Sequence, residues 1–173
     1  MKQILLFIVC LFGLGTMAVH AQQDTIPTDS VLYQQAIQAL KDKKFFFKVD
    51  RFNDNSRSLK ADPFKTYVLM EDENVTISCY PNGFGGWAKE GKSSNYRMKT
   101  DKKGNLSVTM TFRDGFSGSA KFIFTLEKGS NRCIMTCSPI KYFRKFSLTG
   151  ELLSSEKADL INTFMFLNER KSK

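Results

Sequence analysis

The alternation of apolar and polar residues constrains the fold of this chain more than any other feature of its sequence. In NLSVTMTF (105–112), every second residue from Leu106 to Phe112 is apolar and the others are Ser or Thr. Successive side chains of a β-strand point to opposite faces, so this pattern predicts a strand with one buried and one hydrated face. Similar segments predict eight strands, over residues 45–52, 66–71, 74–80, 92–100, 105–112, 119–127, 132–138 and 142–150.

Turns rich in Gly, Asn and Asp join these segments, which indicates an antiparallel meander. We therefore predict a mainly β fold with a minor α content. Its core is a curved sheet of about eight antiparallel strands, or a partly open barrel or sandwich. Residues 30–43 have an apolar face at helical spacing and predict an N-terminal helix, with Asp29 or Ser30 as its N-cap. Residues 154–173 predict a C-terminal helix that packs against the sheet, and a helix that binds a partner or a membrane surface is the less favoured alternative.

The first 21 residues are typical of a secretory signal peptide. Lys2 precedes an apolar run from Ile4 to Leu14, and Val19-His20-Ala21 forms a cleavage site after which we expect processing. The apolar run is too short for a membrane-spanning helix. We therefore predict export to the periplasm or cell envelope, and a lipoprotein route through Cys10 is the less favoured alternative.

The predicted mature chain consists of a flexible lead-in over residues 22–29, a single β-rich domain over 30–153 and the C-terminal helix. It contains no further apolar stretch that could span a membrane. His20, the only histidine, leaves with the leader. Histidine-dependent catalytic triads and imidazole metal ligands are therefore excluded. We predict a protein that is not an enzyme, with no catalytic residue, cofactor or metal site.

The stretch GWAKEGKS (86–93) satisfies the phosphate-loop pattern G-x-x-x-x-G-K-[ST]. A phosphate loop precedes a helix whose N-terminus faces the phosphates, but Ser93, Ser94 and Asn95 are poor helix formers. Glu90 would also place a carboxylate beside the phosphates. We therefore predict no nucleotide site and interpret this stretch as part of a Gly-rich loop.

The Gly-rich loop and the strand after it hold our candidate contact residues for a ligand or partner, Trp87, Phe84, Tyr96 and Lys92. Trp87 is the only tryptophan of the chain. It either anchors the loop on the sheet or offers a stacking platform for a sugar ring. The anchor is favoured, since large aromatic side chains more often contribute burial than ligand contact.

Three cysteines remain after removal of the leader, and export would place them in an oxidising compartment. Cys133 and Cys137 on one strand would lie roughly 13 Å apart, too far to bridge each other. Cys79 could pair with Cys133 or Cys137. The favoured alternative is three buried free thiols, because all three fall on apolar faces and an odd number is no disulfide framework.

Longer stretches of the sequence resemble a known family. They are TYVLMEDENVTISC (66–79), GFGGWAKEGKSSNYRMKTDKKGNLSVTM (83–110), LEKGSNRCIMT (126–136) and FSLTGEL (146–152). Over about residues 45–153, the chain resembles domain of unknown function 4251, a family of exported proteins of Bacteroidetes. The resemblance implies no reaction, and it favours turn and loop roles for the shared glycines.

The chain has a formal net charge of +9, and its positive residues fall in small scattered groups. In an exported protein, acidic glycans or anionic lipid head groups are more plausible partners than nucleic acid, so we predict no nucleic-acid partner. We predict a non-catalytic interaction or structural module whose partner is an envelope protein or a glycan. The alternative is a carrier that binds a lipid or other apolar ligand in the concave face of the sheet.

Overall fold

The structure of the protein is a computed structural model that describes residues 28–54, 56–82, 85–115, 118–140 and 144–157. The predicted signal peptide, most of the predicted lead-in and Phe84 lie outside these residues. The predicted C-terminal helix does so as well beyond its first turn, in which residues 156 and 157 are helical.

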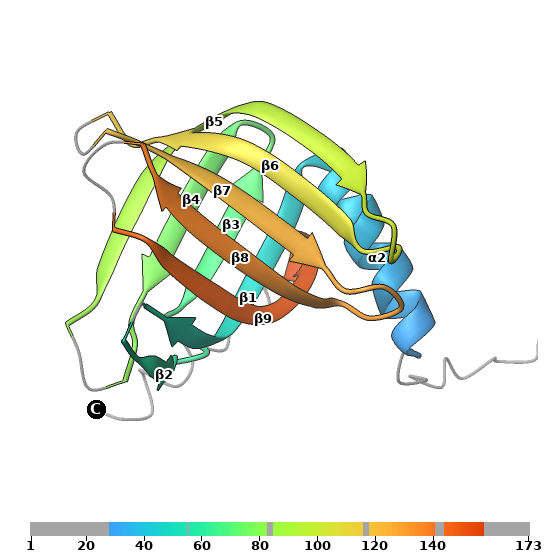
Figure 1. Cartoon of the computed structure of the whole chain (residues 1–173), viewed down its shortest axis with the longest axis horizontal. Coiled ribbons are helices and arrows are strands. Elements are labelled where there is room, and N and C mark those ends of the chain that lie inside the picture. Colours follow the sequence, from blue (N-terminus) through green and yellow to red (C-terminus); the bar gives the residue numbers. More distant parts are fainter. Residues whose placement is uncertain (1–27, 55, 83–84, 116–117, 141–143, 158–173) are drawn as a thin grey trace, which may run out of the picture.

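A closed antiparallel barrel dominates the described part of the chain (Figure 1). Its strands are β1 (Lys44–Asn53), β2 (Ser58–Lys60), β3 (Tyr67–Glu71), β4 (Asn74–Cys79), β5 (Trp87–Thr100), β6 (Leu106–Arg113), β7 (Ser119–Leu126), β8 (Arg132–Pro139) and β9 (Phe146–Ser154). Neighbours along the chain pair with each other from β3 to β9, and β1 pairs with both β3 and β9. Eight strands therefore close into a barrel, and the short β2 adds to one end of β1. The predicted mainly β, antiparallel fold is confirmed. The sheet closes into a barrel, whereas our prediction was a curved sheet or a partly open barrel or sandwich.

The barrel closes along the seam between β1 and β9. The two strands pair from Phe45↔Ser154 to Asn53↔Ser147, with a β-bulge at Asp50. On its other edge, β1 pairs with β3 before the bulge and with β2 after it. Gly150 faces the bulge, and a Cβ atom there would collide with the carbonyl oxygen of Lys48. The seam can therefore close only around a residue without a side chain.

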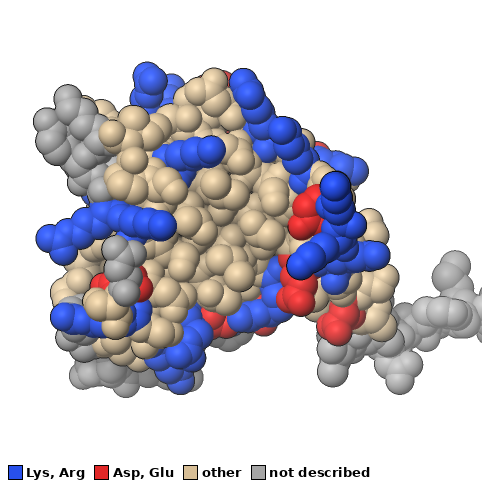
Figure 2. All heavy atoms as spheres, viewed as in Figure 1, with Lys and Arg blue, Asp and Glu red and all other residues tan. Residues whose placement is uncertain are grey.

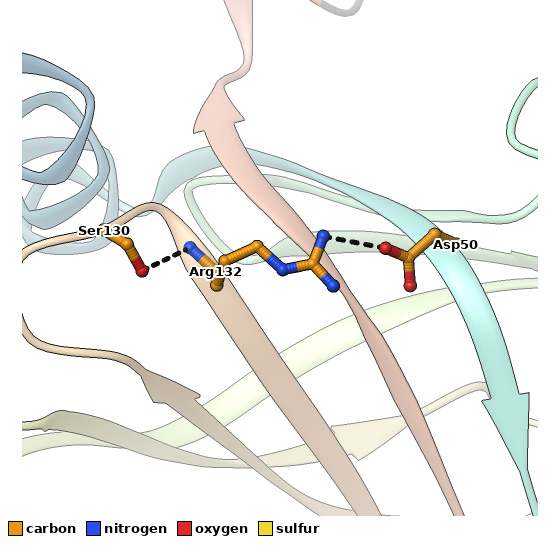
Figure 3. A network of polar contacts seen from close by, with 3 residues as sticks. All are labelled: Asp50, Ser130 and Arg132. Carbon is orange, nitrogen blue, oxygen red and sulfur yellow. Dashed lines mark hydrogen bonds and ion pairs between the residues drawn. The ribbon is translucent and has the colours of Figure 1, made fainter. Parts of the chain in front are cut away.

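An ion pair crosses the outside of this seam (Figure 3). Arg132 at the start of β8 reaches over β9 and donates a hydrogen bond from its guanidinium to Oδ2 of Asp50, at 2.7 Å. The backbone N–H of Arg132 in turn donates to the Ser130 hydroxyl, at 3.2 Å. Both charged side chains are about two-fifths exposed, so the pair orients the bulge more than it stabilises the fold.

Side chains fill the interior of the barrel, as an eight-stranded barrel allows. The largest of these wholly buried side chains are Phe45, Phe47, Met70, Ile77, Met110, Phe112, Phe122, Phe124, Leu126, Met135 and Leu148. Rings meet even between strands that are not neighbours. Phe124 on β7 contacts Phe45 and Phe47 on β1 edge-on, with ring centroids 5.2 and 5.8 Å apart.

Helix α2 (Asp29–Asp42) lies at one end of the barrel (Figure 1). Its buried residues Ala36, Ala39 and Leu40 join the core of the barrel, as the apolar spacing predicted. The N-cap is Thr28, which makes no side-chain capping bond, so our prediction of Asp29 or Ser30 as the cap is wrong. The helix is capped at its C-terminus by Lys43, which adopts a left-handed conformation and donates its N–H to the carbonyl oxygens of Ala39 and Leu40.

Two strand boundaries and one additional strand differ from the prediction, because tertiary pairing extends the sheet into segments of ambiguous sequence. β5 begins at Trp87, within the predicted Gly-rich loop, because β4 pairs with it from Cys79↔Trp87 onward. β9 continues to Ser154 because it pairs with both β8 and β1. The polar segment before Pro63 contains β2, which three residue pairs hold against β1.

We expect Gly150→Ala to lower the free energy of unfolding by about 1–3 kcal/mol, because the added methyl group forces the backbones of β1 and β9 apart. Urea denaturation of the two proteins measures the change. Gly85→Ala is the matched control, because a Cβ at Gly85 meets no atom within 4 Å. The control should change stability by less than about 0.5 kcal/mol. Equal effects of the two substitutions would contradict this account of the seam.

Candidate functional site

The described candidate contact residues do not form one site. Trp87 packs against the core at the end of the barrel opposite α2, whereas Tyr96 packs against it beside α2. Lys92 is exposed on the outer face of β5. Phe84 lies outside the described residues. The structure therefore separates these residues into two interior positions and one exterior position.

An aromatic cluster occupies the end of the barrel opposite α2. Phe52 stacks on Phe146 with ring centroids 5.6 Å apart, and Trp87 meets Phe146 edge-on at 5.9 Å. Phe146 is buried, and Phe52 and Trp87 are half-buried. This packing is what the anchor interpretation of Trp87 requires, because the indole joins the start of β5 to Phe146 on β9.

An ion pair that the sequence analysis missed lies near the same end. Lys89 follows Trp87 on the inward side of β5, and its Nζ lies 2.6 Å from Oδ2 of Asp114 after β6. The Asp114 side chain is only 6% exposed. The shared spacing of Trp87, Lys89 and Gly91 could have revealed an inward-facing lysine, but we interpreted these residues as a loop. The positive charge of Lys89 is balanced by the Asp114 carboxylate, as burial demands.

Tyr96 connects β5 to helix α2. Its hydroxyl donates a hydrogen bond to the backbone oxygen of Leu40, at 2.6 Å. Burial raises the pKa of this phenol, which therefore stays protonated and remains a donor. Lys43 at the end of α2 places its ammonium 5.4 Å from the centre of the Tyr96 ring, within the range of a cation–π contact. These contacts give Tyr96 a structural role in holding α2 on the barrel.

The GWAKEGKS stretch forms strand from Trp87 onward, not a loop before a helix. Residues from Trp87 to Lys92 pair antiparallel with β4. A Cβ atom at Gly91 would collide with the carbonyl oxygen of Arg113. Close packing of β5 on β6 therefore accounts for the second glycine of the pattern.

The three cysteines are free and buried, so the disulfide from Cys79 to Cys133 or Cys137 that we left open is not formed in the structure. Cys79 is on β4 and the other two are on β8, and three strands separate β4 from β8 in either direction around the barrel. Opposite walls of a packed β structure are ~10 Å apart, beyond the reach of a disulfide. Burial raises the pKa of each thiol to about 12.

Hollows on the outer surface are shallow. One of them, of about 790 Å³, lies between α2, the turn from β3 to β4 and the end of β9, and its lining includes Asp42, Glu71, Asp72 and Lys44. A smaller one of about 220 Å³ lies on the outer face of β5–β7. Among the described residues, no group of His, Cys, Asp and Glu is placed to hold a metal ion. No helix in the described part of the chain is long and apolar enough to cross a membrane.

The barrel is similar to that of a solved protein whose family is known. The crystal structure of a DUF4251 family protein from Bacteroides eggerthii DSM 20697 superposes on this protein with a TM-score of 0.65 and 25% sequence identity. The match covers 78% of this chain and 95% of the other. This chain resembles the DUF4251 family. No family model matches the sequence, and no curated protein does.

The DUF4251 resemblance covers nearly the whole of the solved protein, so it concerns the complete barrel and not a shared hairpin or helix. It agrees with the resemblance that the turn and loop residues of the sequence indicated.

We expect Cys79, Cys133 and Cys137 to be inert toward Ellman's reagent at pH 8 in the folded protein that lacks residues 1–21. A thiol with a pKa of about 12 is almost wholly protonated at that pH, and burial excludes the reagent. The absorbance of the released thionitrobenzoate gives the number of thiols that have reacted. Three thiols should react after unfolding in guanidinium chloride without a reductant. Fewer than three would reveal a disulfide.

We expect Lys89→Met to lower the free energy of unfolding by about 1–3 kcal/mol, because it removes a charged partner from the nearly buried carboxylate of Asp114. Thermal and urea denaturation measure the loss. Lys92→Met on the same strand removes the same charge from an exposed position and should cost less than about 0.5 kcal/mol. Equal costs would show that the interior ion pair contributes no more than a surface lysine.

Proposed function

We propose that this protein is an exported, non-catalytic binding module of the cell envelope whose partner binds the outer surface of the barrel. The observation that carries the proposal is the filled interior. Phe124 meets Phe45 and Phe47 across the middle of the barrel, and all three side chains are 0% exposed. A cavity large enough for one water molecule would leave accessible surface on the side chains that line it. No such cavity therefore adjoins these three rings.

The packed interior weighs against the alternative of a lipid carrier. Pockets for small molecules usually have volumes of about 300–1,000 Å³, which is the space of several aromatic side chains. Removing a single buried Phe side chain from a core costs about 3–5 kcal/mol, and whole domains are stable by only about 5–15 kcal/mol. Moving Phe45, Phe47 and Phe124 aside for an apolar ligand would therefore consume most of the stability of the barrel.

The export part of the proposal rests on the leader. Lys2, the apolar run after it and the cleavage site at Ala21 predict processing in the envelope. The module that remains presents an ion pair and hydroxyl-bearing strands to solvent, whereas its thiols face inward. That division suits a binding surface on the outside of a rigid barrel.

Native mass spectrometry of the full chain, expressed in a bacterium and purified from its envelope fraction, tests the proposal. We expect the mass of residues 22–173 with no bound small molecule. A bound mass that is lost on extraction with organic solvent would overturn the proposal in favour of the carrier. A mass that includes residues 1–21 would contradict the predicted processing.

A cavity variant tests the interior independently. Phe124→Ala should open an apolar cavity, and such cavities can bind benzene. We therefore expect benzene to raise the melting temperature of Phe124→Ala and to leave that of the unaltered protein unchanged. Stabilisation of the unaltered protein by benzene would show that the native barrel already holds an accessible cavity, and would contradict the argument from packing.

A further inference from the structure

The outer face of β6, of β7 and of β5 from Lys92 onward carries positive charge and no acidic residue. Residues 92–100, 106–113 and 119–126 contain no Asp or Glu. They contain five Lys and Arg residues, all exposed: Lys92, Arg97, Lys99, Arg113 and Lys121. We call these five side chains, with the Ser and Thr residues between them, the basic face. Glu90 and Asp101 mark its two limits along β5.

The strand register brings like charges together on the basic face. Lys92 is directly opposite Arg113, an arrangement that destabilises an antiparallel pair. Lys121 pairs with Thr111 and is therefore diagonal to Arg113 on the next strand. None of the five cations forms an ion pair with another described residue. The fold thus holds these charges close together at some cost in stability, which a bound polyanion would offset.

Hydroxyl groups fill the space between the cations. Arg97 is directly opposite Thr109, and Lys99 is directly opposite Ser107. Together with Lys121 these residues line a shallow groove of about 220 Å³. A groove of this composition offers three charged donors and two hydroxyls that can donate or accept hydrogen bonds.

We propose that the basic face binds an acidic polysaccharide. Its carboxylate, sulfate or phosphate groups would pair with the five cations, and its sugar hydroxyls would bond to Ser107, Thr109 and the neighbouring hydroxyls. This inference rests on the proposed function, because it names the partner of the outer surface. It does not use the interior of the barrel.

The side chains of the basic face favour a polysaccharide over a membrane or nucleic acid. Figure 2 shows blue Lys and Arg side chains along the upper edge of the molecule, where Figure 1 draws β5 and β6, with a broad uncharged surface below them. The five large apolar side chains that are exposed among the described residues, which could enter a lipid surface, lie outside these three strands. The basic face also lacks an exposed aromatic ring on which bases could stack.

Isothermal titration calorimetry of the protein without residues 1–21 tests the inference, with polygalacturonate as the acidic probe and dextran as the neutral one. We expect binding of polygalacturonate that weakens as salt rises, and none of dextran. The triple variant Arg97→Gln/Lys99→Gln/Lys121→Gln should bind at least tenfold more weakly. The variant Lys60→Gln/Lys65→Gln/Lys145→Gln removes the same charge from exposed positions elsewhere and should bind within about twofold of the unaltered protein.

Four results would overturn the inference: no binding of polygalacturonate, binding of dextran as tight as that of polygalacturonate, equal weakening in the two triple variants, or tighter binding to an alternative polyanion. The alternatives are vesicles that contain phosphatidylglycerol and duplex DNA of random sequence, measured at the same salt concentration. The proposed function would be contradicted separately, by a ligand bound inside the barrel. A protein that carries no bound molecule and does not bind polygalacturonate would contradict the polysaccharide inference but not the proposed function.

Discussion

Pairing of β1 with β9 is the interaction on which the rest of the structure depends. It joins the first and last strands of a meander and leaves the eight strands without a free edge along most of their length. Closure also sets the width of the interior, because the diameter of a barrel follows from its number of strands and their stagger. The bulge at Asp50 and the bare backbone of Gly150 make this closure geometrically possible.

The closed wall divides the side chains into an interior and an exterior population with different chemistry. Inside, aromatic rings meet across the barrel, thiols are held in their protonated form, and the lysine Lys89 is balanced by Asp114. Outside, hydroxyls and cations that form no ion pair with another described residue occupy neighbouring strands. Because the interior is filled, the outer wall is where a partner has room to bind, and the proposed function and the basic face both follow from that division.

The strand segments were predictable because alternation reports burial directly, and six of the eight predicted segments agree with the structure to within two residues at each end. The sequence did not predict correctly which candidate contact residues share a face of the sheet, for a physical reason. A bulge in β5 near Asn95, which adopts a left-handed conformation, shifts the register with β6. It reverses the phase of alternation, so that Lys92 and Arg97 share the outer face while Tyr96 points inward. Counting every second residue from Lys92 would have placed Tyr96 beside it.

The sequence by itself determined the buried face of the strands whose alternation is unbroken, the order of the eight predicted strands and the absence of histidine after residue 20, because these depend only on local alternation and composition. Only the tertiary structure decided that the sheet closes, that Cys79 lies across the barrel from Cys133 and Cys137, and that five cations from three strands share one face. Closure and register depend on contacts between residues far apart in the chain. Local patterns constrain such contacts weakly, since one bulge can move a whole strand to a new phase.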